Sequence, residues 1–198
     1  MTNIQMKKKD IKFLSRYFDD FKKLINFDSD EIKKKIIYLK RIIITTKKKG
    51  KKILVFGNGG SAAIASHFSV DLTKNAKIRC TNYNEANLIT CFSNDYGYEH
   101  WIEMAINYFG DKGDVLIVIS SSGKSKNMIN ACLAGREKKF SKIITLTGHS
   151  KNNPVGKLGD INLWINSKTY NYIENIHQFW LLSLVDLVIG EVNYLPKI

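Results

Sequence analysis

Two short segments of the chain combine glycine and serine in patterns typical of anion binding. Residues 56–61, FGNGGS, contain three glycines and end in Ser61, just after an apolar run. Glycine lets the backbone turn tightly, and the free N–H groups at the start of a following helix attract an anion. Residues 120–125, SSSGKS, offer four serine hydroxyls and a glycine after a second apolar run. Hydroxyls and backbone N–H groups together can hold one phosphate, although a serine-rich helix start without a ligand has the same pattern.

These segments partly match two nucleotide-binding motifs. Gly57, Gly59 and Ala62 fit a relaxed dinucleotide fingerprint, and Glu85 follows the next apolar run as a candidate ribose-binding acid. However, Glu85 comes late for that role, and nothing else in the chain suits a nicotinamide. The second segment lacks the first glycine of a P-loop, because position 118 is valine. The sequence therefore predicts a site for a smaller phosphate compound and no nucleotide cofactor.

The helix expected after the glycine segment carries two side chains that could do chemistry. His67 and Asp71 are four residues apart, which places both on one face of a helix. A histidine and a carboxylate can bind a divalent metal or move protons. The other histidines are isolated, and for these a structural role is the more common outcome; they are His100, His149 and His177.

Alternating segments predict the framework that must position these residues. Amphipathic patterns predict two helices near the start of the chain, over residues 9–26 and from an N-cap at Asp28 to about residue 47. Strands and helical segments then alternate, which predicts a parallel sheet with helices on both faces. The expected strands are Ile53–Phe56, Ile78–Tyr83, Val115–Ser120, Ile143–Thr147 and Ile161–Ile165, and the expected helices are 61–74, 97–109, 124–139 and 172–190. Ligands of such sheets lie at the carboxyl ends of the strands, where both polar segments begin.

Length and composition indicate one globular domain over residues 1–198. Of these residues, 44% are apolar and 25% charged, and no run of about 20 apolar residues could span a membrane. The start of the chain lacks the apolar segment of a signal peptide, so we expect a cytoplasmic protein. The three cysteines lack metal-binding spacing and are expected to be core thiols. The net charge of +13 comes from lysine runs expected on solvated helix faces, so nucleic acid is not the expected partner.

Four motifs, in the same order along the chain, resemble the sugar isomerase (SIS) family in its phosphoheptose isomerase branch. They are GNGGSAA with His67 six residues after Ser61, SNDYGYEH at 93–100, SSSGKS at 120–125 and IENIH at 173–177. The resemblance implies a three-layer αβα sandwich with a flavodoxin-like sheet, usually assembled as a homotetramer. We expect residues 1–48 and the apolar last helix at the subunit contacts. The resemblance further implies two sets of substrate-binding residues: Asn58, Gly59, Ser61 and Asp95 along the sugar, and Ser120, Ser121, Ser122 and Ser125 at the phosphate.

The resemblance also implies that the helix face with His67 and Asp71 is catalytic and binds zinc. The chain departs from the family at three places: Asp71 stands where the isomerases have glutamate, Glu174 where they have glutamine, and Leu182 where they have a histidine that is both ligand and catalyst. We therefore expect Asp71 and Glu174 to act as an acid–base pair while His67 polarises a sugar oxygen. The same three side chains, His67, Asp71 and Glu174, are the candidate ligands of an optional zinc ion.

These inferences predict an aldose–ketose isomerase that converts sedoheptulose 7-phosphate to a heptose 7-phosphate for lipopolysaccharide or capsule. Such an enzyme needs one group to remove and return a proton, and another to stabilise the enediolate oxygen. Two alternatives stay open at this stage. One is a sugar-phosphate-binding or protein-interaction module without catalysis, similar to the family member that binds the bacterial replication initiator. The other is an isomerase that acts on a different phosphosugar.

Overall fold

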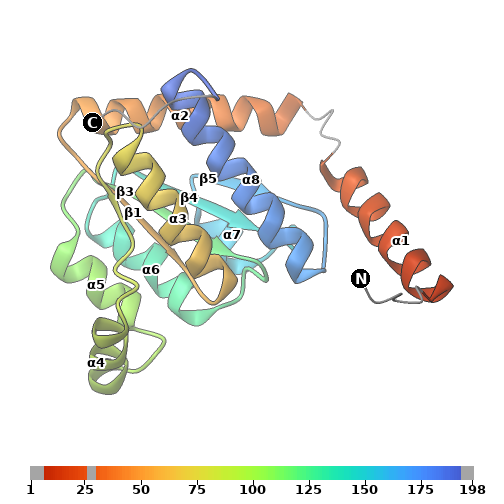
Figure 1. Ribbon diagram of the computed structural model, residues 1–198. Helices are drawn as coiled ribbons and strands as arrows, with labels where there is room; N and C mark the ends of the chain where they lie inside the picture. Colours follow the sequence, from red (N-terminus) through yellow and green to blue (C-terminus); the bar gives the residue numbers. More distant parts are fainter. Residues whose placement is uncertain (1–6, 26–29, 193–198) are drawn as a thin grey trace, which may run out of the picture.

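The computed structural model describes residues 7–25 and 30–192, and a five-stranded parallel sheet lies at its centre (Figure 1). The strands, in the spatial order β2-β1-β3-β4-β5, are β1 (Ile53–Gly57), β2 (Cys80–Thr81), β3 (Val115–Ser120), β4 (Lys142–Thr147) and β5 (Ile161–Trp164). Every residue of β1 and β3 is buried, as expected for apolar strands that are covered on both faces. The predicted αβα sandwich with five parallel strands is confirmed.

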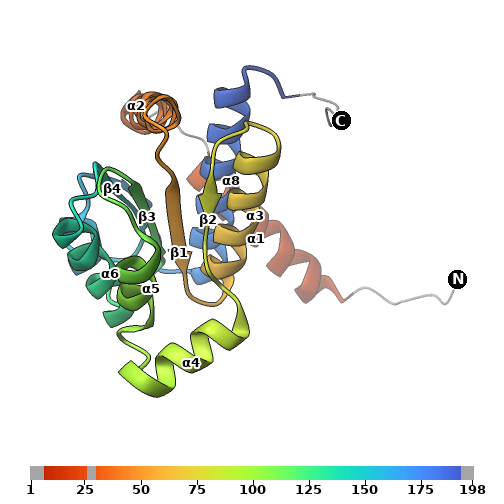
Figure 2. The ribbon, with the colours of Figure 1, turned by 90° about the vertical axis from the view of Figure 1, so that its left-hand side faces the viewer.

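Helices cover both faces of the sheet. They are α2 (Asp30–Lys48), α3 (Gly60–Lys74) and α8 (Tyr170–Ile189) on one face, and α5 (Trp101–Phe109), α6 (Lys126–Glu137) and α7 (Pro154–Leu158) on the other. Val55 and Ile117 pack with the first group, whereas Leu54 and Leu116 pack with the second. Successive residues of a strand thus point to opposite layers. Figure 2 shows the two layers from the side, with α3 and α8 on one side of the strands and α5 and α6 on the other.

The observed helices differ from the predicted ones mainly between β2 and β3. The predicted helix over 97–109 begins only at Trp101, because Gly97 has a φ of 88° and ends a separate helix, α4 (Ala86–Tyr96). We did not predict α4, although its Leu88, Ile89 and Phe92 have helical spacing and lie partly buried against the core. The short α7 was also missed. Its start is capped by the side chain of Asn153, which accepts a hydrogen bond from the Gly156 N–H at 2.7 Å.

The strand predicted at Ile78–Tyr83 is much shorter than expected. Only Cys80 and Thr81 pair with β1. Lys77 and Tyr83 have φ values of 57° and 51°, in the left-handed region that extended strands do not use. The backbone therefore leaves the extended conformation on both sides of the paired residues.

The first helix, α1 (Lys8–Ile25), projects from one end of the sandwich (Figure 1), and only Phe21, Leu24 and Ile25 near its end pack against the core. None of its residues is buried. It meets the start of α8 through Tyr17, whose ring lies 4.6 Å from that of Tyr172 and whose carbonyl accepts a hydrogen bond from the Tyr172 hydroxyl at 3.1 Å. The two predicted N-terminal helices are confirmed as α1 and α2, but the predicted N-cap at Asp28 lies outside the described residues.

Two expectations from composition have different outcomes. No helix in the described ranges is long and apolar enough to cross a membrane. The three cysteines are not all core thiols: Cys132 is buried, Cys80 is partly buried and Cys91 is exposed on α4. Burial raises the pKa of the Cys132 thiol to about 12, which keeps it protonated and unreactive.

Candidate functional site

The carboxyl ends of β1 and β3 bring the two polar segments of the sequence together. Gly57 and Ile119 are paired neighbours on these strands, and the chain turns from them into α3 and α6. A cavity of about 140 Å³ lies between the two turns. It is lined by Asn58, Ser61, Ile119, Ser120, Ser121, Ser122, Ser125, Tyr170 and Glu174. The structure thus places six of the eight predicted substrate-binding residues, together with Glu174, around one cavity.

Several hydroxyl groups in the cavity wall are not used by the protein itself. The side chains of Ser120 and Ser121 are buried, and within the described part of the chain their Oγ atoms have no hydrogen-bond partner. Ser125 is the N-cap residue of α6, yet its side chain makes no capping hydrogen bond. A buried hydroxyl without a partner is costly, so such groups are expected to bond a ligand or water. The wall is therefore suited to a small anion with several acceptor oxygens.

The serine loop is held from behind by the turn that precedes α7. Gly123 has a φ of 67°, and a Cβ at this position would overlap the side chain of Asn153. Asn153 is buried and donates a hydrogen bond to Thr147 Oγ1 at 3.0 Å. The Gly123 carbonyl accepts from the Val155 N–H at 3.0 Å, and the Ser121 carbonyl accepts from the Gly148 N–H at 2.9 Å. These contacts fix the loop before any ligand binds.

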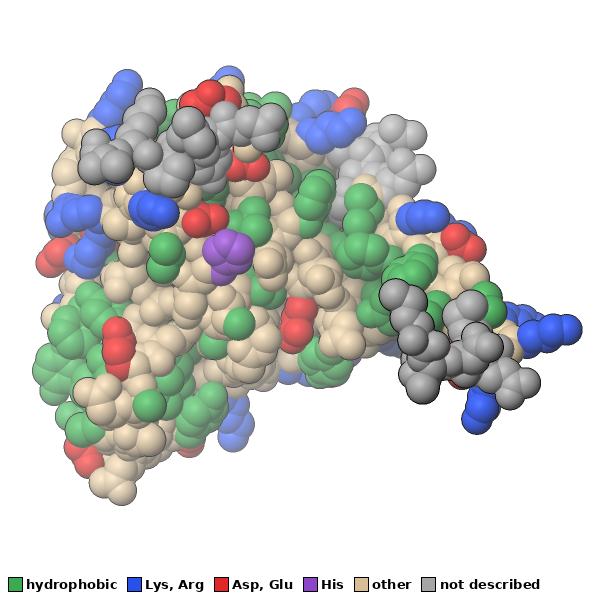
Figure 3. All heavy atoms as spheres, in the orientation of Figure 1, with side chains coloured by type: hydrophobic (Ala, Val, Ile, Leu, Met, Phe, Trp, Pro, Cys, Tyr) green, Lys and Arg blue, Asp and Glu red, His purple; other side chains and the backbone are tan. Residues whose placement is uncertain are grey.

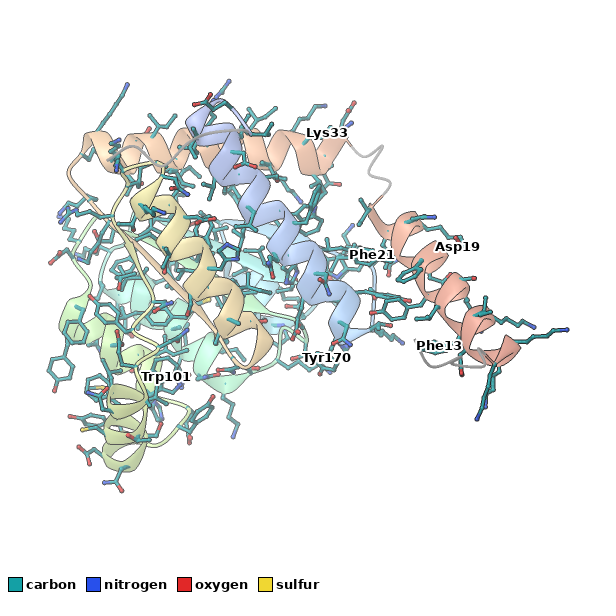
Figure 4. The ribbon with its side chains drawn as sticks, in the orientation of Figure 1. Phe13, Asp19, Phe21, Lys33, Trp101 and Tyr170 are labelled. Carbon is teal, nitrogen blue, oxygen red and sulfur yellow. The ribbon has the colours of Figure 1, made fainter. Side chains whose placement is uncertain are left out.

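Glu174 is the carboxylate in the cavity wall. It comes from the first turns of α8 and reaches the start of α3, where a Cβ at Gly60 would overlap its carboxylate. Glycine at position 60 is therefore required for this approach. The free N–H groups and the positive end of the helix dipole at the start of α3 favour a carboxylate here. Tyr170, at the start of α8 (Figure 4), also lines the cavity, and nothing in the sequence pattern singled it out.

His67 and Asp71 lie on α3 away from the cavity lining. Their Nε2 and Oδ2 atoms are 3.3 Å apart, and the His67 side chain is half exposed. Burial, and to a lesser extent the charge of Asp71, raises the pKa of Asp186 on α8. Gly60 meets Glu174 eleven residues before Asp71, and the helical rise makes this offset about 16 Å along α3. The structure does not place Asp71 beside Glu174.

The separation of Glu174 from Asp71 along α3 also affects the predicted zinc site. Within the described ranges, no group of three or more histidine, cysteine, aspartate or glutamate side chains could hold a metal ion. His67 and Asp71 supply two neighbouring donors, and Glu174 lies further along the α3–α8 contact. Zinc sites in proteins use at least three protein ligands. The donors that lie together in the described chain are too few for a zinc site. Zinc binding by His67, Asp71 and Glu174 therefore stays an untested prediction.

The remaining candidate residues lie around the site rather than in it. Gly59 forms the turn before α3 with a φ of 53°. Asp95 is exposed on α4, where its Oδ1 accepts a hydrogen bond from the Asn94 side chain at 2.9 Å. His100 Nδ1 lies 2.7 Å from the Glu103 carboxylate. His149 lies beside the cavity-lining Tyr170, with their ring centroids 5.1 Å apart.

His177 has the structural role that was expected of it. Its side chain is fully buried on α8, with Nε2 3.3 Å from the Thr147 carbonyl oxygen. Burial lowers its pKa to about 4, and the Thr147 carbonyl offsets only part of this effect. The imidazole is therefore neutral at neutral pH. Thr147 ends β4, so the histidine links α8 to the strand beside the serine loop.

The chain matches a known family of protein domains. Residues 16–148 match the family model of the SIS domain, which covers more than half of the chain. Among proteins with curated names, phosphoheptose isomerase from Aliarcobacter butzleri is 34% identical over 160 residues, which cover 78% of this chain and 84% of that protein. The phosphoheptose isomerase from Glaesserella parasuis is 36% identical over 161 residues, covering 78% and 83%. The chain belongs to the SIS domain family, in its phosphoheptose isomerase branch.

Solved structures agree with this assignment. The phosphoheptose isomerase from Neisseria gonorrhoeae has a TM-score of 0.83 and 26% identity, and the match covers 89% of this chain and 98% of that one. The phosphoheptose isomerase from Francisella tularensis has a TM-score of 0.84 over 94% of this chain and 100% of that one, at 24% identity, and supports the fold alone.

Proposed function

We propose that the protein is an aldose–ketose isomerase that interconverts sedoheptulose 7-phosphate and a heptose 7-phosphate. The observation that carries the proposal is the single cavity with unused serine hydroxyls on one wall and the Glu174 carboxylate on another. The serine loop and the start of α6 would hold the phosphate through hydroxyls, backbone N–H groups and the helix dipole. Similarity to curated phosphoheptose isomerases over more than three quarters of the chain supports this substrate.

In this proposal, Glu174 is the group that moves the proton. Its carboxylate takes a proton from C1 of the ketose, and the C2 carbonyl oxygen becomes an enediolate oxygen. The resulting carboxylic acid returns the proton to C2, while the O1 proton passes to O2 and leaves an aldehyde at C1. The start of α3, which already lies against Glu174, supplies N–H groups and a positive dipole end near the developing negative charge. Because Asp71 is remote from Glu174, we propose one carboxylate for both transfers.

We further propose that the active form is a homotetramer in the cytoplasm and that its product serves surface polysaccharide synthesis. The exposed apolar side chains of α1 support an assembly, because Ile11, Phe13, Leu14 and Phe18 are exposed, while only Phe21, Leu24 and Ile25 pack, partly buried, against the core of the same chain. A second copy of the chain is the simplest cover for such a helix.

Deuterium incorporation tests the proposal directly. The protein is incubated with sedoheptulose 7-phosphate, and separately with hexose and pentose phosphates, in deuterated water with and without added zinc. We expect deuterium at the carbon next to the carbonyl of the heptose, because the proton removed by Glu174 exchanges before it returns. Exchange only with another sugar would change the substrate. Binding of all these sugars without exchange would instead indicate a module without catalysis.

A further inference from the structure

Three side chains from three different elements meet at the cavity wall beside Glu174. Asn58 follows β1, Asn127 lies in the first turn of α6, and Tyr98 lies in the turn between α4 and α5. Asn127 Nδ2 donates to Asn58 Oδ1 at 2.9 Å, and Asn58 Nδ2 donates to Asn127 Oδ1 at 3.1 Å. The Tyr98 hydroxyl donates to the same Asn58 Oδ1 at 3.1 Å. Among these three, Asn58 is the residue that lines the cavity.

Counting donors and acceptors defines what Asn58 can offer a ligand. An amide side chain has one oxygen that accepts and one nitrogen with two N–H groups. The Asn58 oxygen already accepts two hydrogen bonds, and one of its N–H groups is taken by Asn127. Within the described chain, no protein acceptor takes the second N–H. Asn58 is therefore set up as a donor toward the cavity.

Asn127 and Tyr98 both hold Asn58 in this arrangement. Asn127 is only 2% exposed and Asn58 is partly buried, so their reciprocal pair is partly shielded from water and fixes the plane of both amides. Tyr98 is 53% exposed, and its hydroxyl is a second donor to the Asn58 oxygen. Its hydroxyl also ties the α4–α5 turn to the cavity wall, because Tyr98 directly follows Gly97, which ends α4.

We propose that Asn127 and Tyr98 are positioning residues that aim one Asn58 N–H at the substrate oxygen that becomes negatively charged during isomerisation. The proposal rests on the isomerase function proposed above and extends it. A donor that is already oriented costs no reorganisation when the charge develops, and losing one such donor typically costs about 10²- to 10³-fold in rate. Neither Asn127 nor Tyr98 needs to touch the substrate for this effect.

The test compares three variants. Tyr98→Phe removes one hydroxyl at an exposed position, and Asn127→Ala removes the reciprocal amide. The matched control is Tyr96→Phe, because Tyr96 is also exposed near the same turn but its hydroxyl lies 3.3 Å from that of Tyr108 and not at the cavity. For each protein we would measure kcat and KM with sedoheptulose 7-phosphate, and the Kd of inorganic phosphate as a probe of the serine loop.

We expect kcat to fall about 3- to 10-fold in Tyr98→Phe and about 10- to 100-fold in Asn127→Ala. The Kd of phosphate should stay within about twofold, because the serine loop is not touched, and Tyr96→Phe should match the unmodified protein. A general loss of structure in Asn127→Ala would weaken phosphate binding as well, and Tyr98→Phe then decides the matter. Unchanged kcat in Tyr98→Phe would overturn the proposal.

A nuclear magnetic resonance measurement separates this proposal from the proposed function. The Asn58 side-chain amide signal should shift in Tyr98→Phe and stay unchanged in Tyr96→Phe. In the unmodified protein, the same signal should shift when sedoheptulose 7-phosphate is added. If the protein shows no turnover but these shifts occur, the isomerase assignment fails and the donor role of Asn58 stands. If the sugar phosphate binds and the Asn58 signal does not move, the donor role is wrong.

Discussion

At the scale of single residues, Glu174 and Asp71 can be told apart by activity. Glu174→Gln keeps the size of the side chain and its ability to form hydrogen bonds, but an amide cannot carry the proton. We expect kcat to fall at least about 100-fold, as is typical for the loss of a general base. Asp71→Asn should keep at least about ten times more activity than Glu174→Gln, because Asp71 does not line the cavity. Steady-state kinetics of both variants checks this order, and the reverse order would return the catalytic role to Asp71.

His177 makes the stability of the protein depend on pH in a defined direction. Its pKa is about 4 in the folded protein, against about 6.5 for an unperturbed histidine. Between these values the unfolded chain binds a proton that the folded chain does not, so stability is fully present above pH 6.5 and falls as the pH drops toward 4. We expect a loss of up to about 3 kcal/mol in the free energy of unfolding from this group.

Urea denaturation at several pH values between 4 and 7 measures this dependence. Other groups also take up protons as the pH falls, and burial followed by the charge of Asp71 raises the pKa of one of them, Asp186. The difference between the unmodified protein and His177→Gln isolates the histidine, since both chains share the other groups. If stability depends on pH in the same way in the two proteins, folding does not lower the pKa of His177.

At the scale of elements, the serine loop depends on the turn behind it. Gly123→Ala would place a Cβ against Asn153 as well as straining a φ of 67°. We expect phosphate affinity to fall at least tenfold and the protein to lose about 1–3 kcal/mol of stability. Gly50→Ala is the matched control, because Gly50 has a similar φ of 64° and nothing within 4 Å of an added Cβ. Calorimetric titration with inorganic phosphate would separate them. Equal phosphate affinity in the two variants would contradict the bracing role of Asn153.

Some helices and strands could be predicted from the sequence pattern, whereas contacts between distant elements could not. The strands β1 and β3 could be predicted because their apolar runs are buried on both faces, and the polar segments after them fixed the location of the cavity. The helix α4 was missed, although its partly buried Leu88, Ile89 and Phe92 have helical spacing. The separation of Glu174 and Asp71 could not be predicted either, because it depends on how far α3 and α8 are offset along their contact. Likewise, the sequence pattern gave no signal for Asn127 or Tyr98, whose role depends on contacts between distant elements.

At the scale of the whole molecule, α1 predicts assembly. Phe13 and Phe18 are 65% and 55% exposed, and Figure 3 shows apolar side chains along this projecting helix. In Figure 4, Phe21 lies on the side of α1 nearer α8, and Asp19 lies on the other side. Exposed aromatic side chains on one element are typical of a protein interface. We therefore expect the protein to be a tetramer in solution.

Light scattering after size-exclusion chromatography measures this assembly. The double variant Phe13→Ser and Phe18→Ser should shift the mass toward smaller species while the thermal transition of the sandwich persists. Asp19→Ser, a substitution on the same helix, should keep the mass of the unmodified protein. If the unmodified protein is a monomer at micromolar concentration, the proposed tetramer is wrong.

A crystal structure with sedoheptulose 7-phosphate bound would test most directly whether the cavity beside the serine loop is the substrate site. We expect the phosphate group at Ser120, Ser121, Ser122 and Ser125, with the sugar extending toward Asn58 and Glu174. The molecule also has a larger open groove of about 770 Å³ between α2 and β5, lined in part by Lys35 and Trp164. If the sugar phosphate were found in that groove, with the serine hydroxyls still unpaired, the serine loop would not be the phosphate site.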